Sequence, residues 1–485
     1  METKGDCKKL WHESKKICNI QSKKTGKTEL VTDSDNPVPT LNKINDYFAT
    51  VGKNLAAKTL SLLGLTETDL ARNNEQYSTV NTSPKSFFLT PTDEQEIFSI
   101  ISHLKTASAT GYDGINNTIL KECSHALVGP IAFLCNLSLS TGKVPDCIKI
   151  ANICPIFKSG DPKIPSNYRP ISLLTALSKI LEKVVNKRLL AYLEHNGLLS
   201  DNQYGFRVGR STEDAVTNLA DFITLNLGQG QACTGIFLDL AKAFDTISRE
   251  ILIKKMSLLG VRGTALEWFI SYLNDRTQRV VLGEYSSDPN IAQFGVPQGS
   301  VLGPTLFIIY INGLCAMKIP QAKIFTYADD TAIVFFGKTW DDVKFSVESG
   351  VQAIANWLQH NLLTLNIDKT RAINFAISKR SAPKSVTCIK LHSCSSPENC
   401  TCPYIEQTAS IKYLGVFVDN RLSWSAHLSA LRSRVRKMLR IFKQLGKIAD
   451  DSVLKMIYFS LCQSVLNYCI IAWGAAGKTL LIKVE

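Results

Sequence analysis

The chain has 485 residues, of which 45% are hydrophobic, so it is long enough for about three domains with well-packed cores and is not an intrinsically disordered chain. Its 55 basic and 42 acidic residues give a formal net charge of +13, which favours a polyanionic partner. The longest apolar stretch falls short of the about 20 residues that a bilayer span needs, and no apolar segment follows Met1, so we expect no membrane span and no secretory signal.

The cysteines indicate a reducing compartment. There are 14 of them, scattered along the chain, and several lie within apolar runs, as Cys135, Cys154 and Cys233 do. This pattern suits buried thiols better than a disulfide framework. We therefore expect an intracellular protein, in the cytoplasm, the nucleus or both, that is not secreted.

Residues 1–86 are expected to form a looser basic extension. Lysines crowd the first thirty positions, a pattern that is most often a solvated arm. An irregular turn at 33–39 precedes a helix predicted over 41–63, because apolar residues recur there on one face.

A strand and a pair of cations come next along the chain. The run 150–158 predicts a strand, which a polar loop follows. Lys158 and Arg169 flank that loop, where Arg could hold a triphosphate by a bidentate fork and Lys as a point charge. Two ordinary surface cations are the alternative. An amphipathic helix is then predicted over 177–195.

The stretch 203–211 combines two arginines, two aromatic rings and two glycines before the next predicted helix. Arg207 and Arg210 in such a loop suit contact with backbone phosphates, and the rings suit stacking on bases. A glycine-rich surface turn explains the same composition equally well.

Two predicted strand regions carry the acids on which the functional hypothesis depends. The apolar run 235–240 is typical of a buried strand, yet it holds Asp239, and a carboxylate there is costly unless a cation or hydrogen bonds compensate it. Further on, two β-rich runs flank Asp329 and Asp330, which predicts a hairpin with two carboxylates at its tip. Asp is also a common turn residue, so the hairpin alone fits a solvated turn; with Asp239 it predicts a Mg²⁺ site.

Between these acids lie Phe244 and a glycine-rich loop. The Phe244 ring could form a floor under an incoming sugar and clash with a 2′-hydroxyl, although an ordinary core aromatic is the alternative. Asp245 beside it could cap the following turn instead of binding metal. The stretch 294–304 has three glycines and two prolines, which predicts a tight loop that opens a helix and lets backbone N–H groups approach a ligand.

Downstream, helices are predicted over 351–363 and 426–448. One face of the second helix is basic and has no acid: Arg432, Arg434, Arg436, Lys437, Arg440, Lys443 and Lys447. A solvated face normally mixes signs, so we expect this face to contact nucleic-acid backbone. Between the two helices lie Cys388, His392, Cys394, Cys400 and Cys402. Their spacing lacks the paired short intervals of zinc sites, so we favour a decorated hairpin loop over metal binding.

Four motifs in this order and approximate spacing resemble the reverse transcriptase of non-LTR retrotransposons, jockey-like elements above all. They are Asn-Tyr-Arg-Pro-Ile-Ser at 167–172, Phe-Leu-Asp-Leu-Ala-Lys-Ala-Phe-Asp at 237–245, Gly-Val-Pro-Gln-Gly-Ser-Val-Leu-Gly-Pro at 295–304 and Tyr-Ala-Asp-Asp at 327–330. One motif would be weak, whereas four in register are specific. The resemblance extends from about residue 87 to at least 424.

The resemblance implies an α+β right-hand polymerase fold. Fingers and a palm with an antiparallel sheet and helices would occupy 87–418, and a truncated helical thumb 419–485. Asp239, Asp329 and Asp330 would be the palm carboxylates that hold two Mg²⁺ ions, for which Mn²⁺ could substitute. The physics agrees, because three carboxylates brought together repel one another without cations.

The resemblance also implies roles for residues around the acids. Lys158 and Arg169 match positions that hold the triphosphate, Phe244 the sugar gate, and Gln298 with Gly299 the loop that lines nucleotide and template. Lys369 matches a lysine that protonates pyrophosphate. Lys412 and Tyr413 match a primer-grip hairpin, and Arg432, Arg436 and Arg440 lie on a helix that would contact the template–primer duplex.

The implied function is an RNA-directed DNA polymerase that extends a DNA primer on an RNA template with deoxynucleoside triphosphates. An RNA-dependent RNA polymerase is one alternative, disfavoured by Phe244 and by Ala328 where such enzymes place Gly. An inactive nucleic-acid-binding remnant is the other. Such elements usually encode an endonuclease and often a zinc knuckle; the sequence shows neither, so we expect a fragment. The sequence predicts neither target nicking nor an oligomeric state.

Overall fold

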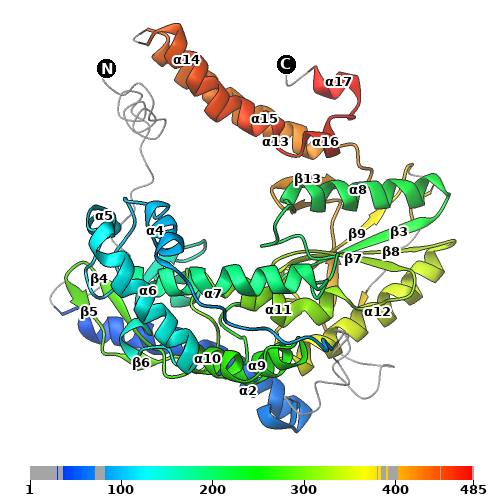
Figure 1. The fold of residues 1–485 in the computed structure, drawn as a ribbon. Coiled ribbons are helices and arrows are strands. Elements are labelled where there is room, and N and C mark those ends of the chain that lie inside the picture. The colour runs from blue at the N-terminus through cyan, green and yellow to red at the C-terminus, as the bar shows by residue number, and fades with distance from the viewer. Residues whose placement is uncertain are drawn as a thin grey trace.

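A computed structural model describes residues 30, 36–70, 82–378, 381–383, 389, 390, 402–447 and 449–482. Within these residues, helices cover two larger sheets, and the C-terminal helices extend away from the rest of the molecule (Figure 1). None of the helices described combines the length and the apolar character needed to cross a membrane. The mixture of helices with mainly antiparallel strand pairs confirms the expected α+β class.

The larger sheet has six strands in the order β10-β11-β9-β3-β8-β7. Its strands are β3 (Ala232–Leu238), β7 (Ala322–Tyr327), β8 (Asp330–Gly337), β9 (Arg371–Phe375), β10 (Ile389–Lys390) and β11 (Tyr404–Gln407). The central strand β3 pairs antiparallel with both β8 and β9, and it is buried from Cys233 to Leu238. Its nearly continuous apolar run therefore reflects a sheet that is covered on both faces.

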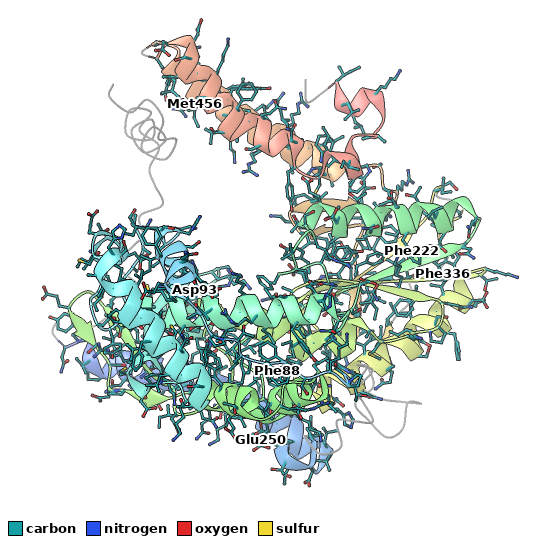
Figure 2. The ribbon with its side chains drawn as sticks, viewed as in Figure 1. Phe88, Asp93, Phe222, Glu250, Phe336 and Met456 are labelled. Carbon is teal, nitrogen blue, oxygen red and sulfur yellow. The ribbon has the colours of Figure 1, made fainter. Side chains whose placement is uncertain are left out.

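Helices cover each face of the six-stranded sheet. α8 (Thr212–Gly228) lies on one face, and α11 (Gly303–Cys315) and α12 (Trp340–His360) lie on the other (Figure 1). On the α8 side, Phe222 meets Phe336 of β8 edge to face, with ring centroids 5.7 Å apart (Figure 2). On the opposite side, α11 is apolar on nearly all its faces and almost wholly buried.

The second sheet has the order β2-β1-β4-β5, with β6 paired to β4. Its strands are β1 (Ile150–Phe157), β2 (Tyr168–Leu173), β4 (Thr277–Leu282), β5 (Tyr285–Ser286) and β6 (Asn290–Ile291). β1 and β2 form an antiparallel hairpin in which Ile156 lies opposite Arg169. The strand predicted over 150–158 is thereby confirmed.

The helix α2 (Val38–Leu63) packs against this second sheet. Three of its apolar residues share a core with β1, β2 and β4: Leu41, Ile44 and Phe48. The Asn45 amide donates to the main-chain oxygens of Gln278, at 3.3 Å, and Asp288, at 2.9 Å. This part of the predicted extension 1–86 is thus integrated into the fold instead of standing apart. The lysine-rich stretch before it lies outside the described residues except for Leu30 and Asn36–Pro37.

The other helices of the body surround these two sheets. They are α4 (Glu94–Ser102), α5 (Asn117–Glu122), α6 (Ser124–Thr141), α7 (Ala176–His195), α9 (Arg249–Leu258) and α10 (Thr264–Leu273), with short 3-10 turns at Asp146–Ile148 and Pro165–Asn167. The predicted helix over 177–195 corresponds to α7. Its apolar face is buried in the main core, which confirms that its task is packing.

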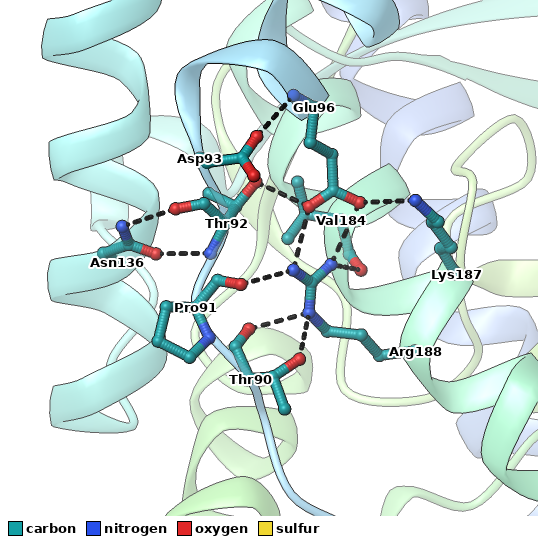
Figure 3. Close-up of polar contacts among 9 residues, drawn as sticks. All are labelled: Thr90, Pro91, Thr92, Asp93, Glu96, Asn136, Val184, Lys187 and Arg188. Atoms are coloured by element: carbon teal, nitrogen blue, oxygen red, sulfur yellow. Dashed lines mark hydrogen bonds and ion pairs between the residues drawn. The ribbon is translucent and has the colours of Figure 1, made fainter.

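A polar network joins α4 to α7 (Figure 3). The Arg188 guanidinium donates to the Glu96 carboxylate, with Nη2 and Oε2 2.8 Å apart. It also donates to three main-chain oxygens, those of Thr90, Pro91 and Val184. Thr92 and Lys187 donate to the same carboxylate at 2.7 and 2.9 Å. Burial alone would raise the pKa of Glu96, but the hydrogen bonds from Arg188, Thr92 and Lys187 lower it to about 2.

The C-terminal region begins with a two-stranded sheet and continues as helices. The elements are β12 (Ser410–Tyr413), β13 (Val416–Asp419), α13 (Ser425–Leu445), α14 (Asp451–Tyr458), a π-helical turn Phe459–Gln463, α15 (Ser464–Asn467), α16 (Ile470–Trp473) and α17 (Lys478–Leu481). The helix predicted over 426–448 corresponds to α13. Leu428 and Leu431 at its start join the core beneath α8, whereas α14 projects away from the body (Figure 1).

Candidate active site

The turn between β7 and β8 carries two adjacent acids. Tyr327 pairs with Asp330, so Ala328 and Asp329 alone form the turn. Ala328 has a φ of +56°, the sign that the first central residue of a type II′ hairpin requires and that Ala seldom adopts. The predicted hairpin is confirmed, with Asp329 in its turn and Asp330 as the first residue of β8.

Asp239 lies at the same end of the six-stranded sheet. It follows β3 directly, and Leu238 pairs with Thr331, so the next position in register places Asp239 opposite Asp330. The Asn366 N–H donates to the Asp239 main-chain oxygen at 2.8 Å, which fixes the strand end from the other side. The sheet thus brings the three predicted acids together at one end of its strands.

The three acids influence one another electrostatically. Burial raises the pKa of Asp329, and the negative charge of Asp239 raises it further. Burial, followed by the charges of Asp329 and Asp239, raises the pKa of Asp330 to about 6. Lys158 and Arg169 lower both values, so the two cations predicted near a triphosphate act on this same site.

The donor set at this end of the sheet fits a hard divalent cation. Among the residues that the structure describes, no three His, Cys, Asp or Glu side chains already form a metal-ligand cluster. Mg²⁺ does not need such a cluster, because it usually binds through one or two carboxylates and completes its shell with water and substrate phosphates. The pKa values of Asp329 and Asp330 stay raised although Lys158 and Arg169 lower them, so the cations of the protein offset the negative charge here only in part. Asp239 and Asp329 therefore fit as ligands, with Asp330 beside them.

Lys242 is a cation of this site that the sequence reasoning did not single out. Its Nζ donates to the main-chain oxygens of Ser166, at 2.9 Å, and Tyr168, at 3.2 Å, which joins the segment after β3 to the β1–β2 hairpin. Burial lowers the pKa of Lys242, and the nearby charges of Lys158, Lys369 and Arg169 contribute to the shift, although Asp245 opposes it. The sequence feature that could have identified Lys242 is its place three residues after Asp239.

The Phe244 and Gln298 side chains have partners inside the protein. The Phe244 ring is stacked on Phe307, with centroids 4.5 Å apart and planes inclined by 18°. Gln298 Nε2 donates to Asp245 Oδ1 at 2.7 Å, so Asp245 supports the 294–304 loop. Burial raises the pKa of Asp245 to about 6, although Gln298 and Lys242 act in the opposite direction. Contacts of Phe244 and Gln298 with a nucleotide stay predictions.

Gly299 lies against β2, and Lys369 lies in the turn that binds the main chain of Asp239. Gly299 has a φ of +111°, and a Cβ there would lie 2.9 Å from the Ser172 oxygen, so the loop can approach β2 only without a side chain. Lys369 is exposed in the turn whose Asn366 holds the Asp239 main chain. Its predicted role with pyrophosphate is not tested by this geometry.

Arg207 and Arg210, predicted to contact nucleic acid, both pair within the protein. Arg207 donates from Nε and Nη2 to the Glu194 carboxylate, at 2.9 and 2.6 Å, and its side chain is only 7% exposed. The hydrogen bond to Glu194 raises the pKa of Arg207. Arg210 pairs with Asp201 and lies over the Tyr204 ring. Nucleic-acid contact by these two side chains stays a prediction; in the structure each of them forms an ion pair with an acid of the protein.

The predicted primer-grip residues differ from each other in exposure. Lys412 is exposed on β12, whereas the Tyr413 ring is buried edge to face against Phe237, with centroids 5.4 Å apart. A cavity of about 500 Å³ separates Lys412 from α13, and the buried His427 lines it with both ring nitrogens unpaired among the described residues. Burial lowers the pKa of His427.

The basic face predicted on α13 is largely open to solvent. Arg436 and Arg440 are exposed, and Arg432 is half-buried. Of the cysteine cluster, Cys388, Cys394 and Cys400 lie outside the described residues together with His392, and Cys402 alone is described. The question of metal binding by these cysteines is therefore not tested.

Comparisons with known proteins agree with this geometry. A family model described as reverse transcriptase (RNA-dependent DNA polymerase) matches residues 156–418, the range that holds all three acids. The probable RNA-directed DNA polymerase from transposon BS of Drosophila melanogaster is 30% identical over 405 residues, which cover 80% of this chain and 43% of that protein.

Two further relatives from Drosophila melanogaster are similar over the same extent. The probable RNA-directed DNA polymerase from transposon X-element is 27% identical over 82% of this chain and 43% of its own length. The RNA-directed DNA polymerase from mobile element jockey is 27% identical over 81% of this chain and 42% of its own length. The chain thus spans less than half the length of these curated relatives.

Proposed function

This chain belongs to the reverse transcriptase family, and from that premise we propose that it is the RNA-directed DNA polymerase part of a non-LTR mobile element. It would extend a DNA primer on an RNA template with deoxynucleoside triphosphates. One observation carries the proposal: Asp239, Asp329 and Asp330 lie at one end of the six-stranded sheet, where burial and the charge of Asp239 raise the pKa values of Asp329 and Asp330, within the electrostatic reach of Lys158 and Arg169.

We assign the parts of a right-hand polymerase to this fold. The five-stranded sheet with α2, α4, α5 and α6 would be the fingers, and the six-stranded sheet with α8, α11 and α12 the palm. The β12–β13 pair with α13 and α14 would form the thumb region. The assignment is supported by the cationic β1–β2 hairpin, which acts on the acids of the other sheet, and by the exposed basic face of α13 beyond them.

The residues of the chain would divide the chemistry as follows. Asp239 and Asp329 would hold two Mg²⁺ ions, which when bound activate the primer 3′-hydroxyl and neutralise charge on the leaving pyrophosphate. Lys158 and Arg169 would bind the triphosphate oxygens and orient the α-phosphate for in-line attack. Lys369, exposed beside Asp239, would supply a proton to the pyrophosphate.

Phe244 would decide which sugar enters. Its stacking on Phe307 leaves the ring little freedom to move, and a fixed ring under the sugar would clash with a 2′-hydroxyl. Deoxynucleotides would therefore be preferred to ribonucleotides. This separates the proposal from an RNA-dependent RNA polymerase.

Primer extension tests the proposed function directly. An RNA template with an annealed DNA primer is incubated with Mg²⁺ and either deoxynucleotides or ribonucleotides, beside an Asp329→Ala variant. We expect incorporation of deoxynucleotides by the wild type and none by the variant. Template that is bound but never extended, with Mg²⁺ or Mn²⁺, would instead favour a nucleic-acid-binding remnant.

A further inference from the structure

The segment 202–205 lies along the outer edge of β7, the last strand of the six-stranded sheet. The Thr326 N–H donates to the Asn202 oxygen at 2.9 Å, and the Tyr204 N–H donates to the Thr326 oxygen at 2.8 Å, as in a short parallel pair. The strand that leads into the acidic turn is therefore covered on its open edge. The sequence pattern of this segment fitted a nucleic-acid-binding loop and a glycine-rich surface turn equally well.

The Gln203 side chain reaches past this edge to the turn itself. It is 1% exposed, and its Oε1 accepts hydrogen bonds from the Ala328 N–H at 3.0 Å and the Gly205 N–H at 2.7 Å. Its Nε2 donates to the Ala328 oxygen at 3.5 Å. One amide thus binds both main-chain polar groups of the residue that precedes Asp329.

Ala328 is the residue that needs such support. A positive φ is unfavourable for Ala and persists only where the surroundings over-determine it. Gly205 belongs to the same arrangement, because a Cβ at that position would lie 2.3 Å from Ala328 N. The close approach of the two segments therefore requires glycine at this position.

The segment 202–205 is itself held in place by hydrogen bonds to other parts of the fold. Asn202 Nδ2 donates to the Cys315 oxygen at 2.8 Å, and the Arg207 guanidinium donates to the Ser200 oxygen at 2.7 Å while it pairs with Glu194. The Cys315 thiol and the Thr326 hydroxyl are 3.2 Å apart. Asn202, Gln203 and Gly205, which we call the clamp, are thus anchored on α7 and α11. The clamp can therefore hold the turn in a fixed position.

We propose that Gln203 is a positioning residue, which holds the Ala328 peptide in its strained conformation and thereby fixes where the Asp329 carboxylate points. The inference rests on the proposed polymerase function, for which Asp329 is a metal ligand. Gln203 does not touch the reacting atoms. A purely structural Gln203 would affect stability alone, whereas a positioning residue also changes how the site responds to Mg²⁺.

The test uses Gln203→Met, which keeps much of the side-chain volume and removes the Oε1 acceptor and the Nε2 donor. We expect the extension rate to fall roughly 10- to 100-fold and the half-saturating Mg²⁺ concentration to rise, with unchanged affinity for template and primer. Hydrogen exchange in peptides spanning 322–337 should become faster, in the absence of metal and nucleic acid. That second readout is independent of the polymerase activity.

Two further variants serve as controls. Gln203→Glu keeps an oxygen acceptor at the same place and should restore slow exchange in 322–337. Asn117→Ala removes another buried amide that makes two hydrogen bonds, at 2.8 and 2.7 Å, but lies on α5 away from the turn. It should lower stability without changing either the Mg²⁺ dependence or the exchange of the hairpin.

The outcomes separate the two hypotheses. A wild-type chain that never extends a primer contradicts the proposed function, and hydrogen exchange then still decides about the clamp. Wild-type exchange of 322–337 in Gln203→Met, or an unchanged Mg²⁺ dependence in an active enzyme, would overturn the role of Gln203. If Gln203→Met does not fold, fast hairpin exchange in a folded Gln203→Glu would overturn it instead.

Discussion

Two groups of acids in this molecule have opposite surroundings. Glu96 receives hydrogen bonds from Arg188, Thr92 and Lys187, and its pKa falls to about 2. At the β7–β8 turn, burial and neighbouring negative charge instead raise the pKa values of Asp329 and Asp330. A carboxylate that the protein neutralises with its own donors stabilises the fold. A carboxylate whose charge the protein offsets only in part is a candidate for binding a cation from outside.

The largest expected effect is at the acidic turn. Asp239→Asn removes one proposed Mg²⁺ ligand and one of the repelling charges, so we expect primer extension to fall by roughly a thousandfold or more while the melting temperature stays equal or rises. Extension assays and thermal unfolding check this. Asp221→Asn removes the same charge from an exposed position on α8 and should leave both unchanged. Full activity of Asp239→Asn would contradict the assignment of this acid.

The network around Glu96 should show the reverse behaviour. Glu96→Gln leaves the Arg188 guanidinium, which is 13% exposed, without its carboxylate. We expect the free energy of unfolding to fall by about 2 kcal/mol, because the mostly buried Arg188 guanidinium loses its charged partner. Activity per folded molecule should change less than about twofold. Chemical denaturation measures the loss, and Glu94→Gln on the exposed side of α4 is the matched control.

The same pair of proteins gives a pH test with a definite sign. The folded pKa of Glu96, about 2, lies below its unfolded value of about 4.5, so its contribution to stability is complete above about pH 4.5. It is lost as the pH falls towards 2. The stability difference between wild type and Glu96→Gln should therefore narrow over that window. A difference that stays constant from pH 5 to 2.5 would show that the carboxylate charge is not what stabilises the network.

Sequence reasoning succeeded where a local pattern determines the structure. The hairpin with Asp329 and Asp330 follows from two β-rich runs with acids between them, and α2, α7 and α13 follow from apolar periodicity. The start of α12 was placed too late, at residue 351 instead of Trp340, although Thr339 and Asp342 form a capping box that marks it. This signal was present in the sequence and was overlooked.

Other features could not be read locally, because they depend on which segments meet in space. Arg207 in a glycine-rich loop has the composition of a phosphate-binding residue, and only the fold places Glu194 beside it. The contact of Gln203 with Ala328 likewise joins residues 125 positions apart. Periodicity reports which face of an element is buried, but it does not name the partner across the interface.

Lys255 tests whether a buried charge must have a binding role, because no catalytic role is expected for it. It is 4% exposed on α9, where its Nζ donates to the Tyr310 oxygen and lies 4.5 Å from the Tyr310 ring centroid and 4.7 Å from that of Trp357. Burial lowers the pKa of Lys255 to about 7, although the nearby Cys315 acts in the opposite direction. If every buried charge with a shifted pKa had a role in activity, Lys255 would have one too.

We expect Lys255→Met to stabilise the protein by about 1 kcal/mol at pH 7 without reducing primer extension, because the buried charge disappears while the aromatic contacts remain. The folded pKa lies below the unfolded value of about 10.5, so the cost of burial is complete below about pH 7 and fades as the pH rises towards 10. The gain should fade likewise, as denaturation at pH 7 and 9.5 would show. Lys58→Met, at an exposed position of α2, is the control. Loss of primer extension in a stable Lys255→Met protein would contradict this expectation. It would show that Lys255 has a role in activity beyond its contacts with the aromatic rings and the carbonyl oxygen.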